Sequence, residues 1–152
     1  MEPAQLLALC VLLEAGGESD EGKAAVCRVI LNREKLHYES DGTVVGTVLR
    51  YDQFSWAWFA FVNGKYTRIS DTPEQAMSIA EYKLKTAPKA ALDHCEMICA
   101  QVEADTFHGP LYDKITDDVV LYVAPKLEKQ MPVWATPDKL VCVIGNQNYY
   151  RA

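Results

Sequence analysis

The segment from Leu12 to Arg33 constrains the fold most, because it interrupts an apolar helical run with two glycines and then resumes a helical pattern. Before it, Leu7 and Cys10 recur at helical spacing, and Glu14 falls on the same stripe. Gly16-Gly17 then ends the first helix. The pattern therefore predicts two consecutive helices, with a carboxyl group on the packed side of the first.

Glu14 is the first candidate for chemistry. Burial disfavours the charged form of a carboxyl group and so raises its pKa. A carboxyl group that stays partly protonated near neutral pH suits a general acid for glycosidic bond cleavage, and tuning to a pKa of roughly 6 is known for that role. The alternative interpretation is an exposed residue at a frayed helix end before Gly16-Gly17.

The pattern of the whole chain predicts an α+β fold that is mostly helical, with a small antiparallel sheet towards the C-terminus. Thr72-Pro73-Glu74-Gln75 combines a capping box with a first-turn proline, which marks a helix start. Asn63-Gly64 between apolar residues indicates a hairpin turn. The expected helices span residues 3–15, 21–36, 44–49, 73–86 and about 89–105. The expected late strands span residues 119–123, 140–144 and 147–151.

Length and composition favour a single domain, residues 1–152, with a core large enough to fold alone: 49% of the residues are hydrophobic and 24% are charged. Five cysteines form an odd set, and four of them fall on apolar faces of expected helices. This usage is typical of buried, reduced thiols in a reducing compartment.

The net charge of −6 argues against nucleic acid as a partner, because phosphate binding depends on Lys and Arg patches. It also argues against stable membrane attachment. The N-terminal Met1-Glu2-Pro3 has no basic region, and the apolar run from Leu6 to Leu13 is too short to span a bilayer. We therefore expect no signal peptide.

Three blocks of sequence, in order, resemble one family. The first is the run E-A-G-G-E from Glu14 to Glu18, followed by Gly22, Ala25-Val26 and Asn32-Arg33; the second is Asp52-Gln53-Phe54-Ser55-Trp56; the third comprises Pro132-Val133-Trp134 and Ile144 to Arg151. Together they resemble the SleB-like cell wall hydrolases, which are related in fold to lytic transglycosylases and goose-type lysozymes.

The resemblance implies a catalytic cell wall hydrolase domain with a lysozyme-like fold, acting on peptidoglycan without metal or cofactor. It implies that Glu14 is the catalytic acid of a lytic transglycosylase that cuts between N-acetylmuramic acid and N-acetylglucosamine. Aromatic, amide and hydroxyl groups would bind the sugars, although core packing is the alternative for Phe54 and the other aromatic residues. The expected substrate-binding residues are Glu18, Gln53, Phe54, Ser55, Trp56, Tyr122, Asn146 and Tyr149.

The chain departs from the family at Gln147, where the resemblance predicts a histidine. The sequence does not determine what replaces the role of that histidine. A single glutamate suffices for transglycosylation, because a hydroxyl group of the muramyl sugar attacks the reaction centre. A hydrolytic muramidase would need a second carboxylate. The candidates are Asp20, Glu21, Asp41 and Asp52, each of which also fits a surface or capping role.

The histidines and cysteines suggest two other chemistries, a metal site and a Cys-His amidase. His94, Cys95, Cys99 and His108 fall close together, but Cys95 and Cys99 lack the paired-ligand spacing of a zinc site, so we expect no metal. A Cys-His amidase, with His108 or His37 as base, needs a partly exposed cysteine that none of the five resembles. An inactive peptidoglycan-binding or virion-associated domain stays open.

The expected lack of a signal peptide suggests synthesis in a host cytoplasm and action on the wall after release. A phage endolysin that depends on a membrane-perforating phage protein fits this situation, and we state it as a hypothesis.

Overall fold

The computed structural model describes residues 1–51 and 53–152, so the predictions for Asp52 lie outside the described residues. Over these residues the chain forms five α-helices, four short 3₁₀ helices and two antiparallel sheets. The α-helices are α1 (Pro3–Ala15), α2 (Asp20–Leu36), α3 (Val44–Val48), α4 (Pro73–Thr86) and α5 (Lys89–Glu103). The strands are β1 (Phe59–Val62), β2 (Lys65–Arg68), β3 (Val119–Val123), β4 (Leu140–Ile144) and β5 (Gln147–Arg151). The 3₁₀ helices are η1 (Ser55–Ala57), η2 (Tyr112–Lys114), η3 (Pro125–Leu127) and η4 (Pro137–Lys139).

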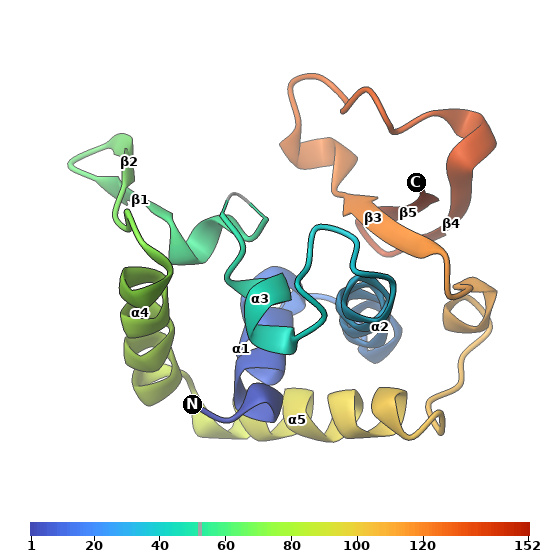
Figure 1. Ribbon diagram of the computed structural model, residues 1–152. Helices are drawn as coiled ribbons and strands as arrows, with labels where there is room; N and C mark the ends of the chain where they lie inside the picture. The colour runs from blue at the N-terminus through green and yellow to red at the C-terminus, as the bar shows by residue number, and fades with distance from the viewer. Residues whose placement is uncertain (52) are drawn as a thin grey trace.

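Helix α1 is the centre of the helical body. It contacts α2, α3, α4 and α5, and Figure 1 shows α5 crossing beneath it and α4 on its outer side. Every side chain from Leu6 to Val11 is fully buried. Because burying one large aliphatic side chain contributes roughly 1.5–3 kcal/mol, this helix anchors the main core and fixes the position of its last turn.

The helices begin where capping residues satisfy the first free backbone N–H groups. Ser19, Thr43 and Thr72 cap α2, α3 and α4. The hydroxyl group of each accepts a hydrogen bond from the backbone N–H three positions later, at 3.2, 2.9 and 3.2 Å. The expected helix starts are therefore confirmed to within a residue.

The C-terminal sheet has the strand order β3-β5-β4, so the last strand lies in the middle. Tyr122 on β3 pairs with Tyr149 on β5, and Ile144 on β4 pairs with Gln147 across the Gly145-Asn146 turn. Gly145 has a φ of 57°, which suits glycine. The fold class, a mostly helical α+β domain with a small late sheet, is as expected.

Strands β1 and β2 form a hairpin that projects from the helical body (Figure 1). Its turn residues Asn63 and Gly64 have φ values of 51° and 79°, as a type I′ turn requires. The hairpin that the Asn-Gly pair predicts is thus confirmed.

Asn32 on α2 ties the helical body to the C-terminal sheet. Its side-chain amide donates to the carbonyl groups of Thr116 and Val119 at 3.0 and 2.9 Å. This pair of bonds fixes β3 against α2, and with it the space between β3 and the end of α1. In the part of the chain described, no helix is both long and apolar enough to cross a membrane.

Candidate active site

A cavity of about 330 Å³ lies between the last turn of α1, the segment that leads into η1, and the end of β3. We call it the Glu14 groove. It is lined by Glu14, Arg33, Gln53, Phe54, Ser55, Tyr122, Val123, Ala124, Leu127, Glu128 and Gln147. Helical, loop and sheet residues that are far apart in the sequence therefore meet at one carboxyl group.

The carboxyl group of Glu14 is held from the sheet side. The hydroxyl group of Tyr122 donates a hydrogen bond to its Oε1 at 2.7 Å, which joins the two halves of the fold. Burial raises the pKa of Glu14 and is the largest effect, while the Tyr122 hydrogen bond and the positive charge of Arg33 act in the opposite direction. The net direction is upward, as expected from the sequence.

Arg33 also lines the groove, although the sequence marked it only as part of the first block that resembles the family. Its Nε donates to the Val120 carbonyl at 2.6 Å, and an Nη donates to Oε1 of Gln53 at 3.3 Å. The guanidinium carbon lies 5.6 Å from the centre of the Phe54 ring. Burial lowers the pKa of Arg33, but a guanidinium stays protonated in proteins. A fixed positive charge thus faces the groove, and a charged residue within an apolar stripe was the signal that could have revealed it.

Gln147, at the position where the resemblance led us to expect a histidine, also lines the groove. Its side-chain N–H donates to the backbone carbonyl of Glu14 at 3.5 Å, and its Oε1 accepts from the Tyr149 hydroxyl at 3.0 Å. The glutamine therefore connects β5 to the backbone of the residue that carries the carboxyl group.

The structure brings only some of the expected substrate-binding residues into the groove. Four of the eight line it: Gln53, Phe54, Ser55 and Tyr122. Phe54 is only 1% exposed and also belongs to the main core, the alternative considered for it.

The other four lie away from the lining. Trp56 packs against the main core, and Tyr149 is fully buried beneath the groove. Glu18 and Asn146 instead bind each other: the carboxylate accepts from the Asn146 backbone N–H at 3.0 Å and from its side-chain amide at 3.4 Å. Direct substrate contact by Tyr149 would require its burial to be undone, so its part in the site runs through Gln147.

Three of the proposed second carboxylates make structural contacts. Asp20 lies 2.8 Å from the His94 ring, Glu21 accepts from the backbone N–H groups that open η2, and Asp41 accepts from the Thr43 backbone before α3. None of these three lines the groove. Glu128, at the end of η3, does line it, and the sequence pattern did not single it out.

The five cysteines are free thiols in the structure, and all are buried. Over residues 1–51 and 53–152, no group of three or more His, Cys, Asp and Glu side chains could hold a metal ion. Burial raises the pKa of Cys10 well above its ordinary value, which keeps this thiol protonated next to the groove.

Comparison with known families identifies the chain. A family model described as Cell Wall Hydrolase matches residues 17–150. The chain belongs to the cell wall hydrolase family. The matched segment begins just after Glu14 and contains Glu18, Gln53, Tyr122 and Gln147. The expected family is confirmed, and the protein is an enzyme of that family.

The fold of this cell wall hydrolase matches a solved structure, the catalytic domain of the germination-specific lytic transglycosylase SleB from Bacillus anthracis. The TM-score is 0.63 at 18% sequence identity, and the alignment covers 98% of this chain and 93% of that chain. No curated protein matches the cell wall hydrolase. A phage origin, a role in host lysis and a membrane-perforating partner stay predictions.

Proposed function

We propose that this cell wall hydrolase cleaves the glycan strands of peptidoglycan between N-acetylmuramic acid and N-acetylglucosamine, with Glu14 as the general acid. The observation that carries the proposal is the position of its carboxyl group, shielded in the groove and bonded to the Tyr122 hydroxyl at 2.7 Å. The description of the SleB catalytic domain as a lytic transglycosylase supports transfer of this reaction to the same fold.

In the proposed reaction, protonated Glu14 donates its proton to the bridging oxygen of the scissile bond as the bond breaks. A hydroxyl group of the muramyl sugar then attacks the sugar carbon and gives its proton to the Glu14 carboxylate. The products are a free N-acetylglucosamine end and an anhydromuramyl end. The carboxyl group returns to its protonated form, so one carboxyl group serves as both acid and base in each cycle.

The neighbours of Glu14 support both protonation states of this cycle. Burial favours the protonated acid before bond cleavage. After proton transfer, the Tyr122 hydroxyl donates to the new carboxylate, and the positive charge of Arg33 stabilises it from the α2 side. Gln53, Ser55 and Gln147 supply amide and hydroxyl groups along the groove wall for the polar substituents of the sugars.

The substitution Glu14→Gln tests the assignment, because glutamine keeps the size of the side chain and has no acidic proton to transfer. We expect clearing of a peptidoglycan suspension to fall at least 1,000-fold, within the range for a general acid. Glu96→Gln on α5 is the matched control and keeps the parent rate. A Glu14→Gln variant that clears the suspension as fast as the parent would overturn the assignment.

A hydrolytic muramidase is the second candidate, and one observation favours it. Glu128 is the second carboxylate among the described residues that line the groove, and hydrolysis ordinarily uses two. In that reaction, Glu128 would activate a water molecule while Glu14 protonates the leaving group.

Mass spectrometry of the released muropeptides separates the two reactions. Transglycosylation gives anhydromuramyl products lighter by one water than the products of hydrolysis. If the parent gives hydrolysed ends and Glu128→Gln removes them, the muramidase is correct. If the parent releases nothing from any wall preparation, the chain is a binding domain instead of a catalyst.

A further inference from the structure

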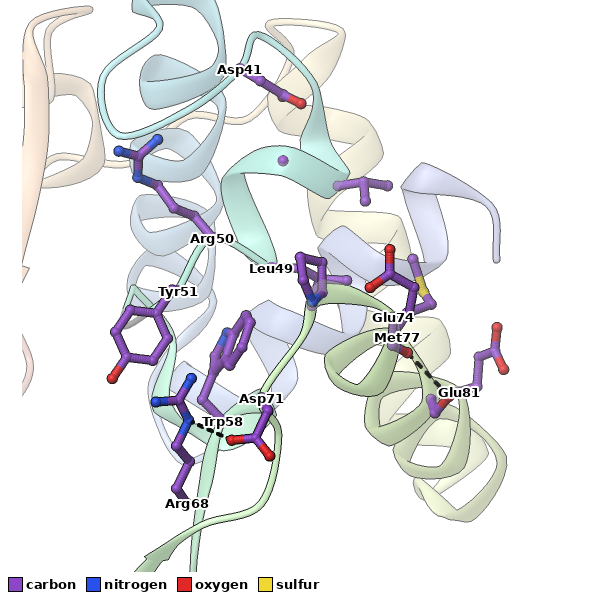
Figure 2. A pocket seen from close by; sticks show the side chains of 14 residues that line it. Asp41, Leu49, Arg50, Tyr51, Trp58, Arg68, Asp71, Glu74, Met77 and Glu81 are labelled. Carbon is purple, nitrogen blue, oxygen red and sulfur yellow. Dashed lines mark hydrogen bonds and ion pairs between the residues drawn. The ribbon is translucent and has the colours of Figure 1, made fainter.

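A second cavity, of about 820 Å³, lies between α3, α4 and the residues that flank η1. We call it the α4 cavity. Figure 2 shows the side chains that line it, with Leu49, Trp58 and Met77 around its apolar floor. Trp58 is 2% exposed, so this floor belongs to the packed interior and does not depend on mobile surface side chains. Among residues 1–51 and 53–152, none lines both this cavity and the Glu14 groove.

One wall of the α4 cavity is acidic. Glu74, Met77, Ser78 and Glu81 recur at the spacing of one helical face, and all four line the cavity. Within the described part of the chain, no lysine, arginine or histidine lies within ion-pair distance of Glu74 or Glu81. Two carboxylates with no cation partner therefore stand beside an apolar floor.

The rest of the lining carries two arginines, Arg50 and Arg68, together with the carboxylates of Asp41 and Asp71. Arg50 pairs with Glu39 at 2.7 Å and Arg68 with Asp71 at 3.2 Å, and both arginine side chains are close to half exposed. Exposed ion pairs contribute little, typically 0–1 kcal/mol, so a bound carboxylate can replace either partner. The Arg68 guanidinium carbon also lies 4.8 Å from the centre of the Tyr51 ring, which orients it along the wall.

Neighbouring residues of one short segment line the two cavities. Gln53, Phe54 and Ser55 line the Glu14 groove, whereas Tyr51 and Trp58 line the α4 cavity. Ser55 and Trp58 are three positions apart, and three residues span at most about 10 Å.

We propose that the α4 cavity binds the peptide stem of peptidoglycan, the short peptide carried by each muramic acid. The proposal rests on the proposed function, which puts that polymer in the Glu14 groove. A stem with a diamino acid has free carboxylates and one ammonium group joined by alkyl segments. The carboxylates bind Arg50 and Arg68, the ammonium group binds Glu74 and Glu81, and the alkyl segments lie on the apolar floor. Three extended residues reach about 10 Å, which is also the greatest span of the three chain steps between Ser55 and Trp58.

This arrangement makes the enzyme selective for stems that are not cross-linked, because cross-linking converts the ammonium group to a neutral amide. An amide would leave Glu74 and Glu81 without a cation partner, and complementary charges set specificity more than raw affinity.

Isothermal titration of the full chain with a stem peptide tests the site without requiring catalysis. The probe is N-acetyl-L-alanyl-γ-D-glutamyl-meso-diaminopimelic acid, and the comparison probe is the same peptide with its free amine acetylated. We expect the first probe to bind at least 10-fold more tightly than the second. The double variant Glu74→Gln with Glu81→Gln raises the Kd of the first probe at least 10-fold.

Helix α5 offers a matched control, because Glu96 and Glu103 have the same seven-residue spacing as Glu74 and Glu81. Replacing both by glutamine removes the same charge and leaves the Kd unchanged. Equal weakening by both double variants, equal binding of the two probes, or no heat at millimolar peptide overturns the proposal. If the peptide does not bind but the enzyme clears walls normally, only the peptide-site proposal fails and the proposed function stands. If the peptide binds tightly but the chain releases no muropeptides, only the proposed function is contradicted.

Discussion

Glu14 and Glu18 lie four positions apart in the sequence, yet the fold gives them opposite surroundings. The Glu14 carboxyl group is shielded in the groove and accepts one hydrogen bond from a tyrosine hydroxyl. The Glu18 carboxylate lies at an exposed turn and accepts from a backbone N–H and an amide of Asn146. The same residue type therefore suits proton transfer in one place and turn stabilisation in the other. The difference lies in the contact from the sheet: β3 reaches Glu14, and the turn between β4 and β5 reaches Glu18.

Replacing Tyr122 by phenylalanine would test whether the sheet sets the behaviour of Glu14. The hydrogen bond from Tyr122 lowers the pKa of Glu14, so its loss raises that pKa further. The acid then stays protonated to higher pH, and the basic limb of the pH profile for wall clearing moves upward. Loss of positioning lowers the maximal rate by ~10- to 100-fold. A pH profile that superimposes on that of the parent would show that Tyr122 only packs.

Replacing Glu18 by alanine tests whether this carboxylate stabilises the Gly145-Asn146 turn. We expect the free energy of unfolding to fall by about 1–2 kcal/mol, because the Asn146 backbone N–H loses its charged partner. Urea unfolding measures this loss, and Glu18→Gln restores part of it by keeping one acceptor oxygen. Clearing activity per folded molecule stays within about twofold. A larger activity loss at unchanged stability would move Glu18 into the catalytic machinery.

Gly145→Ala tests the same turn from the opposite side. A Cβ atom at Gly145 would lie 3.1 Å from a Glu18 carboxylate oxygen, and its φ of 57° already disfavours alanine. We expect a loss of about 1 kcal/mol or more in thermal unfolding. Gly64→Ala is the control, because it has a positive φ but no atom within 4 Å of the added Cβ. Equal losses in the two variants would show that Glu18 does not crowd the turn.

The smallest expected effect is on thermal stability, which the burial of the Glu14 carboxyl group lowers at neutral pH. The folded-state pKa of Glu14 is raised above its ordinary value of 4.5, so its contribution to stability is present below that value and is lost as pH rises through the folded pKa. Glu14→Gln removes this loss, and we expect its Tm to exceed that of the parent by about 2 °C at pH 7. The difference disappears near pH 4. A variant less stable than the parent at pH 7 would contradict the role of burial.

Local sequence signals predicted the elements of this fold well. Capping residues and prolines determine where helices start, and these interactions span only a few positions, as at Thr72. The Asn63-Gly64 turn is equally local, since its positive φ values depend on those two residues. The position of Glu14 on the apolar stripe of its helix predicted the shielding of its carboxyl group.

The contacts that complete the site could not be predicted in the same way. Tyr122 and Glu14 are 108 positions apart, and their bond depends on how β3 packs against the helical body. The order β3-β5-β4 is a long-range pairing that strand propensity does not determine. Glu128 enters the groove through an irregular segment without periodicity, so no pattern marked it.

The central position of β5 makes the surroundings of Glu14 depend on a strand that lies far from it in the sequence. The acid at position 14 precedes the strand at positions 147–151 in the sequence, and β3 and β4 each pair with that strand and not with each other. The hydroxyl group that bonds to the acid belongs to Tyr122 on β3, so the surroundings of the proposed proton donor are complete only when β5 joins the sheet. Activity therefore depends on closure of the sheet around β5.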